Sequence, residues 1–544
     1  NHPATSRSRF NDQPNGGIGM FAVLIKGGTI VDGTGKPGYR ADLGIVGEKI
    51  EAIGDLSQAQ ARRYIDATGH VVSPGFIDAH VHSDAVLLID GQHPQGLRQG
   101  ITTEILGQDG LSYVPSSPEN YRMYNHYLSG ILGRAPDDLD MSSVTAFKAN
   151  YHHKTAINIV TNVAHGALRV EACGMHDVPM VGDRLDHAKR LVREGMEQGA
   201  VGLATGMSYH PQAWSDTEEL VELCKVVAEF DGVYTTHLRD VNPDRGFGGG
   251  GVPEALEIGR RSGVKVHFSH TRTAVNTAGQ VAELMEQFDE AKDEVDLTLE
   301  LYPYPTGSSF MLSSMPSQAH NGGPAEIIER LQDADERAVI VAHIEASGKR
   351  VVREFVYSHM PLTPELEGLT VPTLSERRGK SFGEVTIDLL LENDLEVGFW
   401  GVPPGDINDW KQVSRDAVEL LSRTDYMVGS DSIHVGGHPH PRAWGTFPRF
   451  LGRLRRQFPI MSLESMVQRM TDNAARRFGL TGRGRLEKDY FADIVVFDAD
   501  RIIDTATYDD PRQYPIGIPF VIVNGQVAVD QERCTGVMAG QAIP

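Results

Sequence analysis

The fold is decided by the stretch VVSPGFIDAHVH (residues 71–82). Its two apolar pairs, Val-Val and Phe-Ile, predict a buried strand that ends in two histidines separated by one residue. In an extended strand, residues i and i+2 point to the same face, so His80 and His82 project together from its carboxyl end. A strand that carries metal-capable side chains at its carboxyl tip is typical of a parallel β/α barrel.

The middle of the chain alternates short apolar segments with helical stretches, which is the pattern of a parallel sheet. Seven further segments predict strands, at residues 100–110, 155–166, 199–211, 232–240, 265–272, 297–305 and 426–432. With the first segment they make eight, the number that closes a TIM-like (β/α)8 barrel. Hydrophobic period and charge indicate helices between them, for instance at residues 184–198 and 216–230.

Two β-rich segments flank this middle region. Alternating apolar residues and tight turns occupy residues 21–64, and a matching pattern returns in FADIVVFDAD (491–500) and PFVIVNGQVAVD (519–530). We expect one small β-sandwich domain built from residues 20–72 and 476–544, with the barrel spanning residues 73–475. The alternative is two unrelated β appendages.

Roughly 120 residues separate the last two predicted strands, far more than an ordinary loop. They include the apolar segments AVIVAHI (338–344) and LEVGFWG (395–401), so we expect an inserted subdomain at about residues 309–420. Residues 1–19 are polar and lack an apolar signal-peptide core, and we expect a disordered leader or alternative start there.

Composition narrows the class of partner. The formal net charge of the 544 residues is −22, which argues against nucleic acid and anionic membranes and favours a small-molecule substrate. The three cysteines lie far apart and imply no disulfide framework, so a cytoplasmic location is expected. No apolar run is long enough to span a bilayer. The oligomeric state stays open.

Metal-capable side chains end four of the predicted strands. His80 and His82 end the first strand, His237 the fifth, His270 the sixth and Asp431 the eighth. Imidazole and carboxylate ligands suit Zn²⁺ or a similar divalent ion, and a position left to water is typical of a catalytic site. The sequence therefore predicts a metal site at one face of the barrel.

Several longer motifs, taken together, resemble the amidohydrolase superfamily and, within it, the N-acyl-D-amino-acid deacylase (D-aminoacylase) family. They cover about residues 74–452 and read PGFIDAHVHSD, VGLATGMSYHP, YTTHLRD, EALEIGRRSGVKVHFSHTR, ELYPYPTGSS and HPRAWGTFPRFLG. The resemblance implies a zinc-dependent amidohydrolase, with one or two Zn²⁺ per chain, that cleaves N-acyl-D-amino acids to a carboxylate and a free D-amino acid. Asp431 would serve as general base and then general acid. The preference for the D enantiomer is implied by the resemblance alone.

One metal ligand departs from the family's pattern. Where the family carries a cysteine in a motif like GNCG, this chain has Gly-Gln-Asp-Gly at residues 107–110, so Asp109 takes the ligand's place. A carboxylate is a harder ligand than a thiolate, and its two oxygens suit it to bridging two ions. The alternative is that Asp109 only caps the following turn. The fourth-strand tip, residues 204–207, has no lysine of the kind that is carboxylated in binuclear relatives such as dihydroorotase.

The resemblance also implies which residues hold the free carboxylate of the substrate. Arginine binds a carboxylate through two parallel hydrogen bonds, and the candidates are Arg272 and Arg442. Tyr302 and Ser308 match family residues that hydrogen-bond the same group. For each of the four, the alternative is a structural salt bridge or a buried structural hydroxyl.

Other interpretations stay open at this point. A cyclic amidase of the dihydroorotase or hydantoinase kind is disfavoured by the missing lysine and the two arginines, and a one-metal deaminase by the long motifs. A non-catalytic scaffold need not keep all five histidine and aspartate residues at the strand ends. His434, His438 and His440 could imitate a second metal site, but they lie in a loop rich in glycine and proline after Asp431, and we expect them at the rim of the pocket or in a lid over it.

Overall fold

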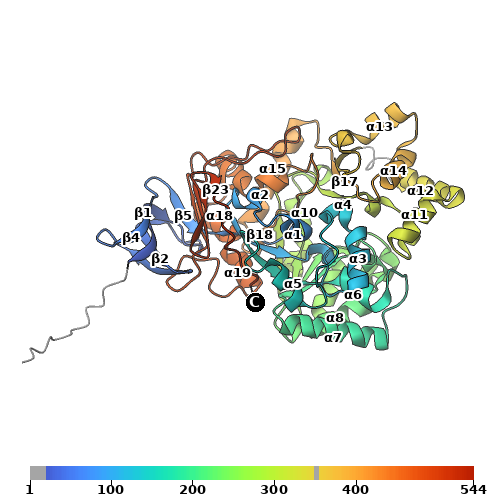
Figure 1. The fold of residues 1–544 in the computed structure, drawn as a ribbon, viewed down its shortest axis with the longest axis horizontal. Coiled ribbons are helices and arrows are strands. Elements are labelled where there is room, and N and C mark those ends of the chain that lie inside the picture. The colour runs from blue at the N-terminus through green and yellow to red at the C-terminus, as the bar shows by residue number, and fades with distance from the viewer. Residues whose placement is uncertain (1–19, 348–353, 544) are drawn as a thin grey trace, which may run out of the picture.

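The computed structural model describes residues 20–347 and 354–543, and the predicted leader at residues 1–19 lies outside the described residues. Figure 1 shows a small β domain at one end of the molecule, a barrel in the middle and a helical lobe at the other end. Among the described residues, no helix combines the length and the apolar character that crossing a membrane requires.

Eight parallel strand positions form the barrel, and each coincides with a predicted segment, except that the last runs one residue beyond it, to Ile433. Three positions are split in two, as β6 (Phe76–Asp78) with β7 (Val81–His82), β9 (Asn158–Thr161) with β10 (Val163–Ala164), and β18 (Tyr426–Val428) with β19 (Ser432–Ile433). The others are β8 (Ile101–Leu106), β11 (Gly202–Gly206), β12 (Val233–His237), β13 (Lys265–Phe268) and β14 (Leu297–Leu301).

The pairing of these strands closes a ring. One parallel sheet runs β6-β8-β9 and another β10-β11-β12-β13-β14-β18. The ring closes where β19 pairs in parallel with β7, with Ile433 opposite His82. Strands such as β8 and β11 are buried along their whole length, as expected for a parallel sheet covered by helices. The predicted (β/α)8 barrel is confirmed.

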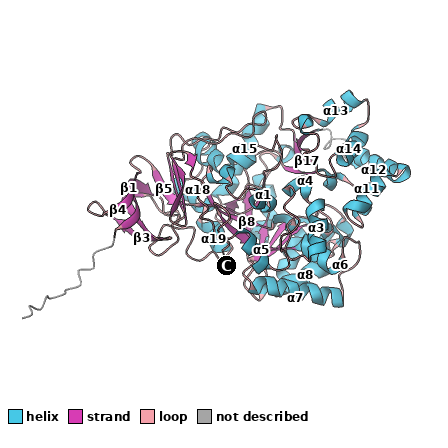
Figure 2. Ribbon diagram, in the orientation of Figure 1, coloured by secondary structure: helices cyan, strands magenta, loops and turns pink. Residues whose placement is uncertain are grey.

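Helices cover the outside of the barrel (Figure 2). The predicted helices at 184–198 and 216–230 are α7 (Asp183–Glu197) and α8 (Thr217–Ala228), and the side chain of Asp216 caps α8 by accepting from the backbone N–H of Glu219. The other main helices around the barrel are α6 (His165–Cys173), α9 (Gly251–Ser262), α10 (Val281–Ala291), α15 (Ile407–Ser422), α18 (Leu463–Met470) and α19 (Asp472–Arg477). Shorter connections hold α1 (Asp84–Ile89), α2 (Pro94–Leu97), α3 (Pro118–Tyr127), α4 (Ser129–Leu132), α5 (Val144–Tyr151), α16 (Arg442–Pro448) and α17 (Arg455–Gln457).

Both ends of the described chain build the β domain, which is one nine-stranded sheet in the order β23-β22-β21-β20-β5-β1-β2-β3, with β4 also paired to β1. β20 and β5 pair antiparallel and join the two ends, whose apolar residues share one core. The strands are β1 (Phe21–Ile30), β2 (Tyr39–Val46), β3 (Lys49–Gly54), β4 (Ala61–Asp66), β5 (Val71–Pro74), β20 (Ile494–Phe497), β21 (Phe520–Val523), β22 (Gln526–Asp530) and β23 (Arg533–Cys534).

The stretch at residues 71–82 is therefore not one strand. Its first part, β5, belongs to the β domain, and the barrel begins with β6 after Gly75. Only glycine fits between the two strands, because a Cβ at Gly75 would lie 2.1 Å from Oγ1 of Thr102.

The helical lobe is formed by residues that lie in the sequence between the seventh and eighth barrel positions, β14 and β18. An antiparallel sheet in the order β15-β17-β16 packs with four helices there. The segment AVIVAHI lies within a helix, α12, and LEVGFWG contains strand β17. The elements are β15 (Ser308–Phe310), β16 (Phe355–His359), β17 (Gly398–Gly401), α11 (Pro324–Gln332), α12 (Ala334–Ser347), α13 (Val371–Arg378) and α14 (Phe382–Glu392).

Candidate metal centre

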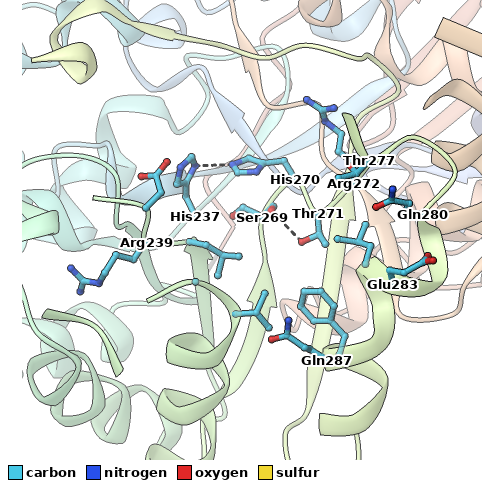
Figure 3. Close-up of a pocket in the computed structure, with 16 residues that line it drawn as sticks. His237, Arg239, Ser269, His270, Thr271, Arg272, Thr277, Gln280, Glu283 and Gln287 are labelled. Atoms are coloured by element: carbon cyan, nitrogen blue, oxygen red, sulfur yellow. Dashed lines mark hydrogen bonds between the residues drawn. The ribbon is translucent and has the colours of Figure 1, made fainter. Parts of the chain in front are cut away.

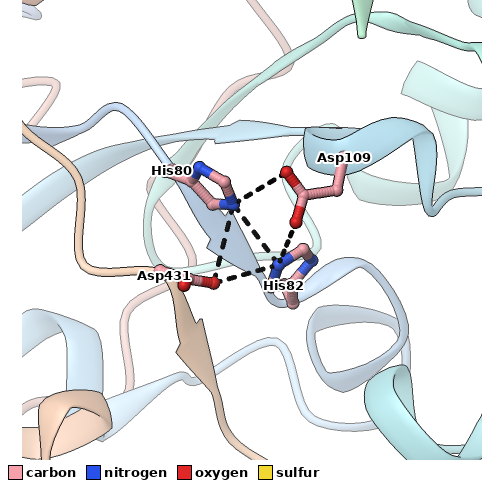
Figure 4. A group of neighbouring side chains, drawn as sticks. All are labelled: His80, His82, Asp109 and Asp431. Atoms are coloured by element: carbon pink, nitrogen blue, oxygen red, sulfur yellow. Dashed lines mark hydrogen bonds and ion pairs between the residues drawn. The ribbon is translucent and has the colours of Figure 1, made fainter. Parts of the chain in front are cut away.

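Four buried side chains meet where the barrel ring closes (Figure 4). Nε2 of His80 lies 3.3 Å from Nε2 of His82. The carboxylate of Asp109 lies 3.5 Å from His80 and 3.6 Å from His82. On the opposite side, Oδ1 of Asp431 lies 3.6 Å from His80 and 3.2 Å from His82. Two imidazole nitrogens and two carboxylates thus face one point.

A second group of ligand atoms shares Asp109 with the first. Nδ1 of His237 lies 2.8 Å from Nε2 of His270 and 3.6 Å from Oδ2 of Asp109. His237 ends β12, and His270 follows β13 by two residues. The carboxylate of Asp109 therefore lies between the histidines of the first strand and those of the fifth and sixth strands.

The backbone is unusual at three of these residues. Asp109, His270 and Asp431 have φ values of 55°, 33° and 51°, in the left-handed region that non-glycine residues seldom adopt. Each lies just beyond a barrel strand, where the chain must turn sharply to aim its side chain inward. Such conformations cost free energy and cluster at functional sites, where surrounding structure holds them.

A residue that the sequence analysis missed supports both groups. Oε1 of Glu300, on β14, lies 2.9 Å from Nδ1 of His80 and accepts the backbone N–H of His270 at 2.5 Å. Glu300 fits because of Gly429, where a Cβ would lie only 1.6 Å from Oε2 of Glu300. On the other side, Nε2 of His237 lies 2.9 Å from the hydroxyl of Ser208. The sequence signal that could have identified Glu300 is a carboxylate between two leucines at the end of a predicted barrel strand.

The carboxylates of Asp109, Glu300 and Asp431 make the space between the histidines favourable for a positive charge. Burial would lower the pKa of His80, but Asp109, Glu300 and Asp431 raise it well above its ordinary value. Burial would raise the pKa of Asp431, but Arg442 and His80 hold it well below its usual range. Burial and the neighbouring His237 lower the pKa of His270 to about 3, so its ring is neutral and has a lone pair to offer.

The ligand set fits a divalent metal. Oδ1 of Asp109 is buried without a hydrogen-bond partner among the described residues. The alternative role of Asp109, as a cap of the following turn, stays open. Imidazole and carboxylate ligands at such spacing suit Zn²⁺. The fourth-strand tip brings no lysine, and Gly206 lies against the backbone of Asp109 instead.

The residues predicted to bind a carboxylate lie together beside the first group. Nη2 of Arg272 donates to the hydroxyl of Tyr302 at 2.9 Å. The guanidinium carbons of Arg272 and Arg442 lie 4.5 Å and 4.6 Å from the centre of the Tyr302 ring. Ser308, on β15 of the lobe, is linked more weakly, since its backbone carbonyl accepts from Arg442 at 3.4 Å and its hydroxyl donates to the carbonyl of Phe399.

A cavity of about 690 Å³ opens beside His237 and His270 (Figure 3). It lies between α9 and α10, and its lining includes the apolar side chains of Leu284 and Phe288. The guanidinium of Arg272 points away from Gln287. The side chain of His237 is 20% exposed, whereas those of His80, His82 and Asp109 are almost fully buried, so the centre is reached from the side of His237.

The three histidines expected at the pocket rim are more enclosed than predicted. His434 and His440 are buried, and His440 lies 3.0 Å from the hydroxyl of Tyr508 through Nε2. Nε2 of His438 lies 2.9 Å from the backbone carbonyl of Tyr508. The loop therefore packs against the segment before β21, which sequence patterns did not indicate.

Comparison with known proteins agrees with this geometry. A sequence profile described as the amidohydrolase family matches residues 63–529. A D-aminoacylase of Alcaligenes xylosoxydans xylosoxydans is 32% identical over 96% of this chain and 97% of its own length. An N-acyl-D-glutamate deacylase of the same organism is 34% identical over 92% of both chains. This chain also superposes on the crystal structure of an N-acyl-D-glutamate deacylase of Bordetella bronchiseptica, with a TM-score of 0.79 and 30% identity. The superposition covers 96% of this chain and 99% of that one. That structure contains zinc and a phosphonate inhibitor that mimics the tetrahedral intermediate.

Proposed function

Because this chain belongs to the amidohydrolase family, with relatives of at least 30% identity along nearly its whole length, we propose that it hydrolyses N-acyl-D-amino acids to a carboxylate and a free D-amino acid. The observation that carries the proposal is the position of Asp431. Its carboxylate lies between the histidines of the first barrel strand and Arg442, one of the two arginines predicted to bind the substrate carboxylate.

The histidines and Asp109 would hold the metal. The candidate ligands are His80, His82, Asp109, His237, His270 and Asp431. Because Asp109 belongs to both groups of ligand atoms, the site has room for one or two Zn²⁺ per chain. When bound, zinc lowers the pKa of water and polarises a carbonyl oxygen. The relative crystallised with zinc supports this choice of metal.

Asp431 would move the proton. Its carboxylate is ionised at neutral pH and would accept the proton of the attacking water and then donate it to the departing amine. Its Oδ1 faces the imidazoles of His80 and His82. The carboxylate of Asp109, from the second strand, faces the same two imidazoles. Removing a general base of this kind typically lowers the rate by about 10² to 10⁴.

Arg272 and Arg442 would bind the α-carboxylate of the substrate. In an N-acyl amino acid the carboxylate and the amide nitrogen are attached to the same carbon, so a carboxylate at Arg442 places the amide beside Asp431. Tyr302 lies between the two arginines and would hydrogen-bond the same group, while Ser308 contributes by its contact with Arg442.

The direct test is amine release from matched N-acetyl-D- and N-acetyl-L-amino acids, with hydantoin and dihydroorotate assayed in parallel. D-selective release that is lost in Asp431→Asn supports the proposal. Ring opening of a cyclic amide in place of amine release would favour the cyclic amidase instead.

A further inference from the structure

Three buried ligand atoms form another group, which shares no residue with the candidate catalytic centre. Nε2 of His93 lies 2.7 Å from Oε1 of Glu104, and the ligand atoms of His93, Glu104 and His434 all lie within 4.8 Å of one another. The two imidazole rings are perpendicular, with centroids 4.9 Å apart. His93 precedes α2, Glu104 lies on β8 and His434 follows β19, so residues from three separate places in the fold converge here.

His434 is the member of this group that hydrogen bonding leaves unexplained. Its side chain is 7% exposed, and neither ring nitrogen has a hydrogen-bond partner among the described residues. Buried polar groups are nearly always paired, because an unpaired one loses its bonds to water without replacement. Glu104, by contrast, is fully engaged, since its other oxygen accepts a very short hydrogen bond from Ser83.

We propose that His93, Glu104 and His434 bind a Zn²⁺ ion at a site of their own. Two imidazoles and one carboxylate are ligands that zinc favours, and they leave one position for water. The ion would take the place of the proton between Nε2 of His93 and Oε1 of Glu104, and the neutral ring would carry its one proton on Nδ1 instead. Nε2 of Gln95 lies 3.0 Å from Nδ1 of His93; with its amide turned, its oxygen would accept the N–H of the metal-bound ring and fix the ring's orientation.

Solvent reaches this site by a route separate from the catalytic cavity. A cavity of about 260 Å³ is lined by His93, Gln95, His434, Trp444, Arg512 and Tyr514. The guanidinium of Arg512 lies over the Trp444 ring, 5.5 Å from its centre, which holds this positive charge at the wall. The cavity has room for a water ligand of an ion bound by His93 and His434.

The position of the site indicates its role. His434 directly follows β19, the strand that closes the barrel on β7, and Ser83 directly follows β7. An ion bound by His93, Glu104 and His434 would tie the second and eighth barrel positions to the connection between the first and second, beside this closure. An ion held there would stabilise the seam of the barrel.

Metal content tests the proposal. The full-length protein and the variants His434→Gln and His93→Gln are equilibrated at the same saturating, buffered concentration of free zinc and desalted, and zinc per chain is measured by elemental analysis. His438→Gln is the matched control, because His438 lies in the same loop but outside the group. We expect both variants to lose one equivalent of zinc and the control to lose none, with amine release retained in His434→Gln.

Equal zinc content in the wild type and His434→Gln would overturn the proposal and leave a hydrogen-bonded pair of His93 and Glu104. Loss of zinc together with amine release in His434→Gln would also overturn it, since the ion would then belong to the catalytic centre. If His93→Gln fails to fold by circular dichroism, His434→Gln decides alone, because it removes no hydrogen bond among the described residues. The zinc count is independent of the substrate, so it stands even if the proposed hydrolysis is not observed.

Discussion

Nη1 of Arg442 lies 2.9 Å from Oδ2 of Asp431, and both side chains are buried. The other oxygen of Asp431 lies 3.2 Å from Nε2 of His82. One carboxylate therefore joins the arginine that we assign to the substrate with the histidines that we assign to the metal. A ligand whose carboxylate and scissile amide share one carbon matches this spacing.

Replacing Asp431 by asparagine tests the proton-transfer role. Asparagine keeps the shape of the side chain but cannot accept a proton, so we expect kcat to fall by about 10² to 10⁴. Steady-state amine release measures the loss, and circular dichroism checks the fold. A rate within tenfold of the wild type would assign proton transfer to another group.

Replacing Arg442 or Arg272 by methionine tests carboxylate recognition. Each arginine offers charged hydrogen bonds, and losing one such contact costs about 1.5 to 3 kcal/mol, or roughly 10- to 100-fold in kcat/KM. The same variants are assayed on N-acyl-D-amino acid amides, which lack the carboxylate. We expect the penalty to shrink on the amides, and an undiminished penalty would point to a structural role.

Gly429→Ala tests the support that Glu300 gives to the centre. The new methyl group would lie 1.6 Å from Oε2 of Glu300 and 2.8 Å from Cβ of His80, so the contact between these two side chains would be disturbed. Because outer partners of metal ligands typically contribute 10- to 100-fold in affinity, we expect the zinc affinity to fall by about that factor. Competition with a zinc indicator measures it.

The control for this variant is Gly405→Ala, where a Cβ meets no heavy atom within 4 Å. It should bind zinc as the wild type does. Unchanged affinity in Gly429→Ala would mean that Glu300 does not orient His80.

A histidine remote from the candidate ligands predicts how stability depends on pH. Burial lowers the pKa of His320 to about 3, and its Nδ1 lies 2.8 Å from the hydroxyl of Tyr127. Between this value and the ordinary value near 6.5, the unfolded chain binds a proton that the folded chain does not. The contribution of His320 to the free energy of unfolding is therefore complete above pH 6.5 and decreases as the pH falls.

As the pH falls well below 6.5, we expect the free energy of unfolding of the wild type to decrease by about 1.4 kcal/mol per pH unit more than that of His320→Gln. Urea denaturation at pH 5 and pH 6 measures the difference. His176 is exposed, so His176→Gln should keep the wild-type slope. Equal slopes in wild type and His320→Gln would mean that His320 takes up a proton in the folded state.

Regular patterns made much of the fold predictable. Each barrel strand is a short apolar run, and the histidines and aspartate at strand ends were recognisable because parallel strands share one catalytic edge. The pairing of His80 and His82 followed from the period of an extended chain. The family resemblance is confirmed, whereas the D preference, the individual roles of the site residues and the domain boundaries stay predictions.

The parts that escaped prediction depend on tertiary contacts. Glu300 is a single carboxylate in a strand, and only the space left by Gly429 explains its burial. The left-handed backbone at His270 is set by the turn that follows β13, and propensity does not predict it. His434 and Glu104 meet because the barrel closes on itself, a contact that no local pattern encodes.

The central claim is that a zinc-loaded site beside Asp431 hydrolyses N-acyl-D-amino acids. The most direct measurement is amine release from an N-acetyl-D-amino acid and its L enantiomer by protein stripped of metal with a chelator, before and after zinc is returned. We predict no release from the stripped protein, and D-selective release that returns with zinc in the wild type but not in Asp431→Asn. Equal release with and without zinc, or none from either enantiomer after reloading, would contradict the account.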